Sequence, residues 1–524
     1  MEFLKNVSPR DYQEKIFQRC VEKNCLVVLP TGLGKTLIAL MLSIQRLKEF
    51  PLEKILFLAP TRPLGEQHLK YFESHLSDLF ADMCLFTGSV SPKERKKFWE
   101  SSSIIFSTPQ CIANDLKNNL YDLSGVCLLV EDEAHRCLKN YDYNFVAQKY
   151  KQQSKNPRIL GLTASPGSEA ARIKDICKNL SIESVEIRTR SSEDVKNYLQ
   201  ELEFEKIPVD FPESFEEIRN VLKRIFDRYA EGLKQRNLLF GPATKISLIN
   251  LQKKISTILA RNTGNFSYYS AASSCAQAIK IQHALELLET QTLSGFNAYL
   301  EKLFDEAKKR KSKGVVSLTS SQEFGFVFSK TKELMAKNIE HPKVQVLQEL
   351  INSEILKNTK AKILVFTQFR DTASLVSKKL NENPSVISRI FVGQAKKSGI
   401  NSSETGLNQK EQKKIIADFS SGEINILCAT SIGEEGLDIP EVNMVVFYEP
   451  VTSAIRKIQR AGRTARLMKG KLVMLVTKNT RDENFYYVSR SREKKMHSAV
   501  EEVKDGLGKK EIKQRQERIG KFFS

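Results

Sequence analysis

The chain has 524 residues, is 41% hydrophobic, and carries 82 Lys and Arg against 62 Asp and Glu, a formal net charge of +20. This length exceeds what one hydrophobic core supports and predicts about three domains, while the positive charge favours a polyanionic partner, either nucleic acid or an anionic membrane surface. We find no apolar run of about 18 residues, no signal peptide and no lipidation motif, so we expect a soluble, intracellular protein rather than a membrane-spanning one.

Short apolar runs recur along the first part of the chain and predict β-strands. Their apolarity is continuous rather than alternating, which is typical of strands covered on both faces of a parallel sheet. The runs are CLVVLP (25–30), KILFLAP (54–60), SIIFSTP (103–109), VCLLVED (126–132) and RILGLTAS (158–165). We therefore expect an α/β domain over residues 1–185.

A helical region follows, because strand-like runs nearly vanish between residues 186 and 340. The segments SFEEIRNVLKRIFDRYAEGLK (214–234) and AQAIKIQHALELLETQ (276–291) have the apolar spacing of long amphipathic helices. We expect an all-α insertion here.

The strand pattern returns in the last part of the chain, at KILVFTQ (362–368), SRIFVG (388–393), INILCAT (424–430), MVVFYEP (444–450) and KLVMLVT (471–477). It predicts a second parallel-sheet domain over 341–500, with right-handed crossovers. Residues 501–524 are charged and low in hydrophobic residues, and we expect a flexible tail. The nine cysteines are scattered without paired CxxC spacing, so we expect reduced thiols rather than a zinc site.

The segment LPTGLGKT (29–36) lies between the first strand and a helix and predicts a phosphate-binding loop. Gly32 and Gly34 allow a tight turn whose N–H groups face a phosphate, and Thr31 lies within it. Lys35 would reach the β and γ phosphates, and Thr36 would offer a hydroxyl to Mg²⁺. Leu29 stands where the general pattern begins with glycine.

An acidic cluster, Glu131, Asp132 and Glu133, ends the run VCLLVEDEAH. Three adjacent carboxylates repel one another unless a cation lies among them. Asp132 would hold Mg²⁺, and Glu133 would orient and deprotonate the water that attacks the γ-phosphate. His135 is better explained as a coupling contact than as a metal ligand. DEAH alone could be an ordinary acidic turn, and the GKT segment about a hundred residues earlier favours the catalytic interpretation.

The remaining blocks resemble those of superfamily 2 helicases, in order, over nearly the whole chain. They are PTRPL (60–64), STPQ (107–110), DEAH (132–135), LTAS (162–165), FTQFRDT (366–372), ATSIGEEGLDIPEVNMVVFYEP (429–450) and QRAGRTAR (459–466). The last two, with HALELLETQ in the helical region, most resemble archaeal Hef helicases and the Fanconi anaemia group M type.

This resemblance implies two RecA-like domains with an all-α insertion domain between them. It also implies an ATP- and Mg²⁺-dependent DNA helicase or translocase, acting 3′ to 5′ on forked or branched DNA. Such an archaeal-like enzyme would be cytoplasmic and nucleoid-associated. No ERKxxxD-like nuclease motif follows residue 470, so we expect a helicase-only member. The insertion would select the substrate: its Lys-rich segments, 251–256 and 306–314, either embrace the duplex arm of a fork or are simply solvated helix faces and a loop.

Site residues follow from the resemblance position by position. Arg10 and Gln13 would contact adenine, and Asp438 the nucleotide from the second domain. Gln459 would sense the γ-phosphate, and Arg463 and Arg466 would be arginine fingers; Ala465 replaces the glycine usual in GRTGR. The nucleic-acid backbone would be held by Thr61, Arg62, Thr87, Gly88, Thr108, Pro109, Thr367, Gln368 and Thr430. Thr163 and Ser165 would link hydrolysis to movement.

Two other functions remain open. The double-stranded RNA ATPases of innate immunity also carry a helical insertion between two such domains, but we see no candidate RNA-sensing terminal domain. A non-catalytic scaffold that binds forks would not need the intact phosphate loop and acidic cluster.

The C-terminal segment QERIGKFFS (516–524) carries two adjacent phenylalanines. Gln516, Ile519, Phe522 and Phe523 fit the spacing QxxIxxFF, which resembles the motif by which replication proteins dock on the sliding clamp PCNA. On a helical turn this spacing brings Ile519 and both rings to one face. The alternative is that the rings fold back as an ordinary terminal anchor.

Overall fold

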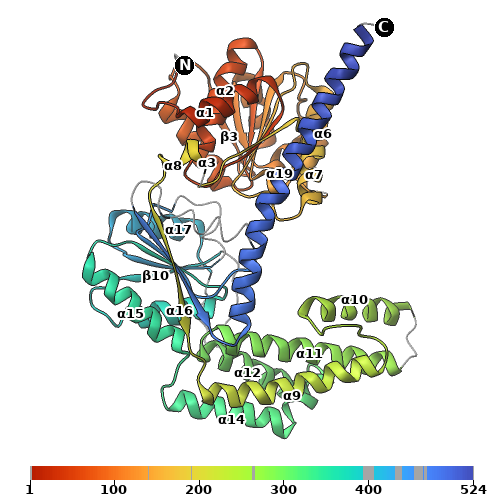
Figure 1. Ribbon diagram of the computed structural model, residues 1–524, viewed down its shortest axis with the longest axis vertical. Coiled ribbons are helices and arrows are strands. Elements are labelled where there is room, and N and C mark those ends of the chain that lie inside the picture. The colour runs from red at the N-terminus through yellow and green to blue at the C-terminus, as the bar shows by residue number, and fades with distance from the viewer. Residues whose placement is uncertain are drawn as a thin grey trace.

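The computed structural model describes residues 3–139, 141–190, 192–261, 266–393, 406–430, 439–453, 464 and 469–522, with 266 and 509–522 as backbone only. Two parallel sheets and a bundle of helices make up this part of the chain (Figure 1). Within these ranges, no helix combines the length and the hydropathy that crossing a bilayer requires.

The first lobe is built on a seven-stranded sheet of order β3-β4-β2-β5-β6-β1-β7, in which every neighbouring pair is parallel. Its strands are β1 (Cys25–Val28), β2 (Lys54–Leu58), β3 (Met83–Phe86), β4 (Ile104–Ser107), β5 (Val126–Asp132), β6 (Ile159–Thr163) and β7 (Ser184–Ile187). The apolar runs predicted five of these strands.

Helices cover both faces of this sheet. Helices α1 (Asp11–Glu22), α2 (Lys35–Glu49) and α3 (Arg62–His75) share a hydrophobic core on one face. On the other face lie α5 (Pro109–Lys117), α6 (Asp142–Gln153) and α7 (Ala170–Asn179). The remaining helical elements of this part are α4 (Pro92–Ser101), the 3-10 turn η1 (Ala134–Arg136) and α8 (Glu193–Lys196). All nine cysteines are unpaired thiols, and Cys84 alone among them is not fully buried.

The second lobe has a six-stranded parallel sheet of order β10-β11-β9-β12-β13-β8. The strands are β8 (Leu202–Val209), β9 (Ile363–Phe366), β10 (Ser388–Phe391), β11 (Ile426–Ala429), β12 (Met444–Phe447) and β13 (Gly470–Thr477). Helices α15 (Pro342–Lys357), α16 (Arg370–Leu380) and α17 (Gln409–Ser421) accompany them. Together the two sheets confirm the predicted α/β class.

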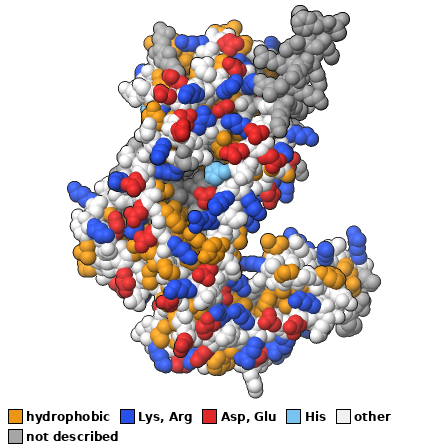
Figure 2. Space-filling view, in the orientation of Figure 1, with side chains coloured by type: hydrophobic (Ala, Val, Ile, Leu, Met, Phe, Trp, Pro, Cys, Tyr) orange, Lys and Arg blue, Asp and Glu red, His pale blue; other side chains and the backbone are white. Residues whose placement is uncertain are grey.

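The insert is a helical bundle whose residues lie, in the sequence, between those of the two lobes. It comprises α9 (Glu213–Gln235), α10 (Lys245–Arg261), α11 (Phe266–Thr290), α12 (Leu293–Lys308), α13 (Lys313–Thr319) and α14 (Gln322–Ala336), with its own buried cores. The expected range of 186–340 is wrong at its start, because β8 pairs with β13 along its whole length and so belongs to the second lobe. The part of the insert that contains α10 and α11 projects sideways (Figure 1), and a hollow separates it from the rest of the molecule (Figure 2).

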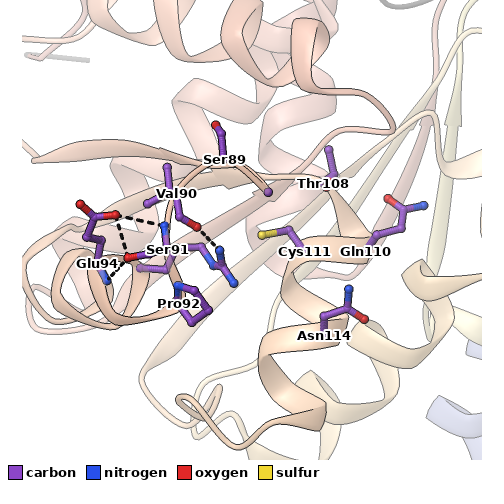
Figure 3. A pocket seen from close by; sticks show the side chains of 11 residues that line it. Ser89, Val90, Ser91, Pro92, Glu94, Thr108, Gln110, Cys111 and Asn114 are labelled. Carbon is purple, nitrogen blue, oxygen red and sulfur yellow. Dashed lines mark hydrogen bonds between the residues drawn. The ribbon is translucent and has the colours of Figure 1, made fainter.

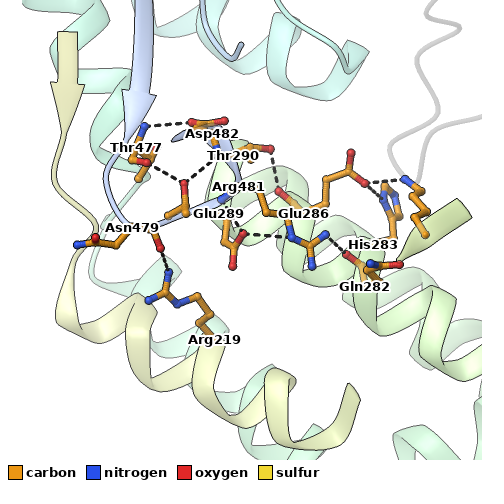
Figure 4. Close-up of polar contacts among 12 residues, drawn as sticks. Arg219, Gln282, His283, Glu286, Glu289, Thr290, Thr477, Asn479, Arg481 and Asp482 are labelled. Carbon is orange, nitrogen blue, oxygen red and sulfur yellow. Dashed lines mark hydrogen bonds and ion pairs between the residues drawn. The ribbon is translucent and has the colours of Figure 1, made fainter. Parts of the chain in front are cut away.

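A polar junction fixes the insert to the second lobe (Figure 4). Lys343, at the start of α15, is fully buried, pairs with Asp482 and donates to the carbonyl of Thr290 at 3.1 Å. Arg481 donates to Glu289 at 3.3 Å and to the carbonyl of Gln282 at 3.0 Å. These bonds cross between α11 and the residues after β13, so the insert and the second lobe form one packed unit.

The helix α19 (Arg481–Phe522) begins at this junction and runs up along the first lobe (Figure 1). Met496, Ala499, Val500 and Val503 are buried in the same core as α5, α6 and α7. The expectation of a flexible tail is therefore wrong at its beginning, since Val503 is 3% exposed and Leu507 packs on that core. The spacing of Val500, Val503 and Leu507 forms an apolar stripe that the low overall hydrophobicity of the segment concealed.

Candidate functional site

The phosphate loop connects β1 to α2. Gly32 and Gly34 adopt φ of +86° and +74°, in the left-handed region that favours glycine. Lys35 donates to the carbonyl of Leu29 at 3.0 Å, across the loop. Because Gly34 is the N-cap of α2, the loop presents the N-terminus of a long helix, which is an environment suited to a phosphate.

The N-terminal helix α1 contacts this loop directly. Gln13 accepts from the backbone N–H of Arg10 at 2.8 Å and donates to the carbonyl of Leu33 at 3.1 Å. The Tyr12 hydroxyl donates to the same carbonyl at 2.8 Å. The guanidinium of Arg10 lies 4.9 Å from the ring centroid of Tyr198, which comes from the segment after α8. Arg10 and Gln13 are thus beside the phosphate loop, as their expected role requires.

Asp132 ends β5 and is 5% exposed. Its Oδ2 lies 2.8 Å from Nε2 of His68, and its backbone carbonyl accepts from the Tyr143 hydroxyl at 2.7 Å. Burial acts to raise the pKa of Asp132, but interactions with His68 and Lys35 outweigh it, so the pKa lies below its usual value. The carboxyl is therefore ionised at neutral pH, as a metal ligand must be.

Glu131 does not belong to this acidic cluster, which corrects the expectation of three adjacent carboxylates. Consecutive strand residues face opposite sides of a sheet, and the preceding Leu129 and Val130 lie in different cores. Glu131 is fully buried, and burial raises its pKa well above the usual value. Burial thus favours the neutral form of Glu131, and its side chain faces away from Asp132.

Glu133 begins a chain of contacts that leaves the acidic cluster. Its Oε2 lies 3.2 Å from Nδ1 of His135, and the same nitrogen lies 3.2 Å from Oγ1 of Thr163. Thr163 in turn exchanges two bonds of 3.1 Å with the backbone of Ser165. The Ser165 hydroxyl donates to the sulfur of Met496 at 2.8 Å. The chain therefore runs from the acidic cluster through the LTAS block to α19.

The expected nucleic-acid residues of the first lobe all follow strands at the carboxyl edge of the sheet. Thr61 and Arg62 follow β2, Thr87 and Gly88 follow β3, and Thr108 and Pro109 follow β4. Since β3, β4 and β2 are neighbours, these residues occupy one half of the edge, and the phosphate loop and Asp132 occupy the other. One sheet edge thus carries both candidate sites.

A pocket of about 460 Å³ lies within the nucleic-acid half (Figure 3). Gly88 and Thr108 line it, as do the N-terminal residues of α4, whose N-cap Ser91 accepts from the N–H of Glu94 at 3.3 Å. Thr108 is the N-cap residue of α5. Two helix N-termini and several hydroxyls meet here, which suits contacts to a sugar-phosphate backbone.

In the second lobe, Thr367 and Thr430 follow the neighbouring strands β9 and β11, and the N–H of Thr367 bonds the carbonyl of Ala429 at 2.9 Å. Gln368, beside Thr367, is exposed. The lobes also touch: Lys413 of α17 pairs with Glu66 of α3 at 3.0 Å. Asp438, Gln459, Arg463, Arg466 and Phe523 lie outside the described residues, as do the side chains of Gln516, Ile519 and Phe522.

The residues around the phosphate loop fit a magnesium ion. Among the described residues, no three His, Cys, Asp or Glu side chains gather as a metal cage. Thr36 and Asp132 instead supply oxygen donors beside a phosphate loop, and Mg²⁺ is usually held by one or two such groups together with substrate phosphates. The sequence did not identify His68, which lies within a helix and belongs to no spacing pattern that indicates a metal site.

Three family models match the chain. The DEAD/DEAH box helicase model matches residues 10–173, and the helicase conserved C-terminal domain matches 342–468. A helical-bundle model, provisionally described as belonging to an ATP-dependent RNA helicase, matches 214–340.

Similar proteins include a Methanocaldococcus jannaschii protein provisionally described as an ATP-dependent RNA helicase, 36% identical over 94% of this chain and 60% of its own length. The ATP-dependent DNA helicase mph1 of Neurospora crassa is 32% identical over 92% of this chain and 42% of its own. The chain thus spans about half the length of these relatives. The crystal structure of the Pyrococcus furiosus Hef helicase domain is 42% identical, with a TM-score of 0.70 over 92% of this chain and 98% of that one.

Proposed function

Because the chain belongs to the superfamily 2 helicase family that contains the Hef helicase domain of Pyrococcus furiosus, we propose that it is an ATP-driven motor that remodels forked or branched DNA. The observation that carries this proposal is the single sheet edge of the first lobe, which bears the phosphate loop with Asp132 and Glu133 on one half and the threonine-rich nucleic-acid residues on the other. ATP chemistry and strand contact are then properties of one rigid element.

Hydrolysis would use the chain's residues in distinct roles. Lys35 and the loop amides bind the phosphates, and Glu133 orients and deprotonates the attacking water. Thr36 and Asp132 would hold Mg²⁺, which neutralises phosphate charge when bound. From the second lobe, Gln459, Arg463 and Arg466 would complete the site and Asp438 would contact the nucleotide; these four roles rest on the sequence alone.

Movement would come from closing and opening the cleft between the lobes. Thr61, Thr87 and Thr108 hold the strand on the first lobe, and Thr367 and Thr430 hold it on the second. Since the contacts of Glu133, His135, Thr163 and Ser165 end on α19, a change at the γ-phosphate reaches the helix that joins the lobes. We propose that the protein moves along the bound strand in the 3′ to 5′ direction.

The test is the ATPase rate of the whole chain with single-stranded, duplex, forked and four-way DNA and double-stranded RNA, at one salt concentration. We expect forked or four-way DNA to stimulate most and Glu133→Gln to abolish the response. Strongest stimulation by double-stranded RNA, which the description of the Methanocaldococcus relative favours, would replace DNA by RNA as the substrate. If no nucleic acid stimulates the ATPase rate, the non-catalytic scaffold that binds forks becomes the favoured function.

We also propose that the protein works inside the cell and docks on PCNA through Gln516, Ile519, Phe522 and Phe523. The support is the QxxIxxFF spacing, which gives one apolar face on a helical turn. Calorimetric titration of the whole chain into the cognate clamp should give a binding isotherm that disappears in the Phe522→Ala, Phe523→Ala variant. Equal heats from both proteins would contradict the docking.

A further inference from the structure

We infer that His68 is the positioning residue of the magnesium site, holding Thr36 and Asp132 in the orientations that the metal requires. This inference rests on the proposed ATP-dependent function, since it concerns the same site. His68 lies on α3, the helix that begins at the predicted nucleic-acid residue Arg62 and has Thr61 as its N-cap.

The imidazole of His68 lies between the two predicted metal ligands. Its Nε2 is 2.8 Å from Oδ2 of Asp132, and its Nδ1 is 3.4 Å from Oγ1 of Thr36. The ring centroid is 4.5 Å from that of Phe57, and His68 is 7% exposed. Burial and this ring contact leave the imidazole little freedom, so it links α2 and β5 from a third element.

The ionised carboxylate gives the direction of one hydrogen bond, and the histidine tautomer that this bond requires gives the direction of the other. An ionised carboxylate only accepts, so Nε2 of His68 carries the proton and donates it to Asp132. In the tautomer that carries its proton on Nε2, Nδ1 is an acceptor, and the hydroxyl of Thr36 donates to it. Each bond thus depends on the other through the tautomer of one ring.

These directions suit a metal site. A Thr36 hydroxyl whose proton is directed to His68 keeps its oxygen lone pairs for a cation. His68 engages one oxygen of Asp132 and leaves the second for the ligand sphere of the metal. Partners of this kind orient the groups that touch a metal, and their loss typically lowers metal affinity about 10- to 100-fold.

The test compares nucleotide affinity with and without magnesium, using fluorescent ADP on the whole chain. His68→Leu keeps an apolar side chain against Phe57 but removes both hydrogen bonds. We expect the gain in ADP affinity on adding Mg²⁺ to fall about 10- to 100-fold, while affinity in EDTA stays near that of the wild type. His68→Gln, whose amide can donate to Asp132 and accept from Thr36, should restore most of the gain.

The matched control is His75→Gln, two turns further along α3, where His75 bonds the carbonyl of Tyr71 at 2.8 Å and touches neither ligand. It should leave the magnesium dependence unchanged. If the leucine variant does not fold, as judged by thermal unfolding, His68→Asn, which is too short to reach both partners, takes its place.

Equal magnesium dependence in the wild type and the variant without the two bonds would overturn the role of His68. So would an equal loss of affinity in EDTA, because a merely structural residue would weaken both measurements alike. Absence of magnesium-dependent ADP binding in the wild type would instead contradict the proposed function itself, so the two failures are distinguishable.

Discussion

Glu133 adopts a backbone conformation that non-glycine residues rarely occupy, with φ of +53° and ψ of +46°. Such positions are held by surrounding structure and often occur at functional sites. Here the conformation follows the end of β5 and turns the carboxylate toward His135, while Asp132 remains within the strand. Asp132 and Glu133, although adjacent in the sequence, therefore contact different histidines, His68 and His135.

Substitution Glu133→Gln should therefore separate binding from hydrolysis. The amide preserves the shape of the side chain but cannot take a proton from water, so we expect ATP affinity to persist and the single-turnover rate to fall by about 10² or more. Single-turnover hydrolysis and equilibrium binding of fluorescent ATP measure the two effects. Turnover close to that of the wild type would remove Glu133 from the catalytic role.

A substitution at Gly34 would test how closely α1 packs on the phosphate loop. A Cβ at this position would lie 2.2 Å from Nε2 of Gln13, and φ of +74° alone disfavours alanine by roughly 1–2 kcal/mol. Gly34→Ala should weaken ADP binding, and it should weaken it less in a Gln13→Ala background, where the collision is absent, than in the wild-type background. The control is Gly125→Ala, which meets nothing within 4 Å. An equal loss on Gly34→Ala in both backgrounds would show that backbone conformation accounts for the whole effect.

At the scale of secondary structure, continuous apolarity predicted the strands that are covered on both faces. It missed the edge strands β3 and β7 of the first sheet and β8 of the second. In β8, LEFEKIPV, charged residues interrupt the apolar run and Val209 alone is fully buried. A similar limit applies to the site. Lys35, Asp132 and Glu133 belong to patterns with fixed spacing, whereas His68 reaches Asp132 across 64 positions, which only the folded sheet brings together.

The junction at the start of α15 makes stability depend on pH. Burial, with a smaller effect of Lys343, lowers the pKa of His341 from 6.5 to about 3. Between these values the unfolded chain binds the proton and the folded chain does not. The free energy of local unfolding should therefore fall as pH is lowered from about 6.5 toward 3, by up to about 1.4 kcal/mol per pH unit.

The variant His341→Asn tests this dependence. Asparagine can replace Nδ1, which accepts from the N–H of Lys343 at 3.3 Å as the N-cap of α15, but it does not titrate. Hydrogen exchange of the α15 amides at pH 7, 6 and 5 should show a shallower loss of protection in the variant. Parallel pH profiles for the two proteins would contradict the assignment.

At the scale of the whole molecule, the insert projects beside a hollow (Figure 2), and the basic residues 308–311 and Lys313 of its segment 306–314 are exposed. Replacing Lys308, Lys309, Arg310, Lys311 and Lys313 by glutamine should reduce the preference for forked over single-stranded DNA and flatten the salt dependence of binding. Lys357→Gln with Lys360→Gln, exposed on the second lobe, is the control. An unchanged fork preference would show that the segment is a solvated surface that does not select the substrate.

The helix α19 has a consequence for the kinetics of the motor. The chain already passes from the first lobe to the second between β7 and β8, and α19 returns from the second lobe to bury Met496, Val500 and Val503 in the first. A doubly joined pair of lobes keeps each at a high effective concentration for the other. The proposed completion of the ATP site by the second lobe would then be a unimolecular event, and its rate per molecule should not change on dilution of the protein.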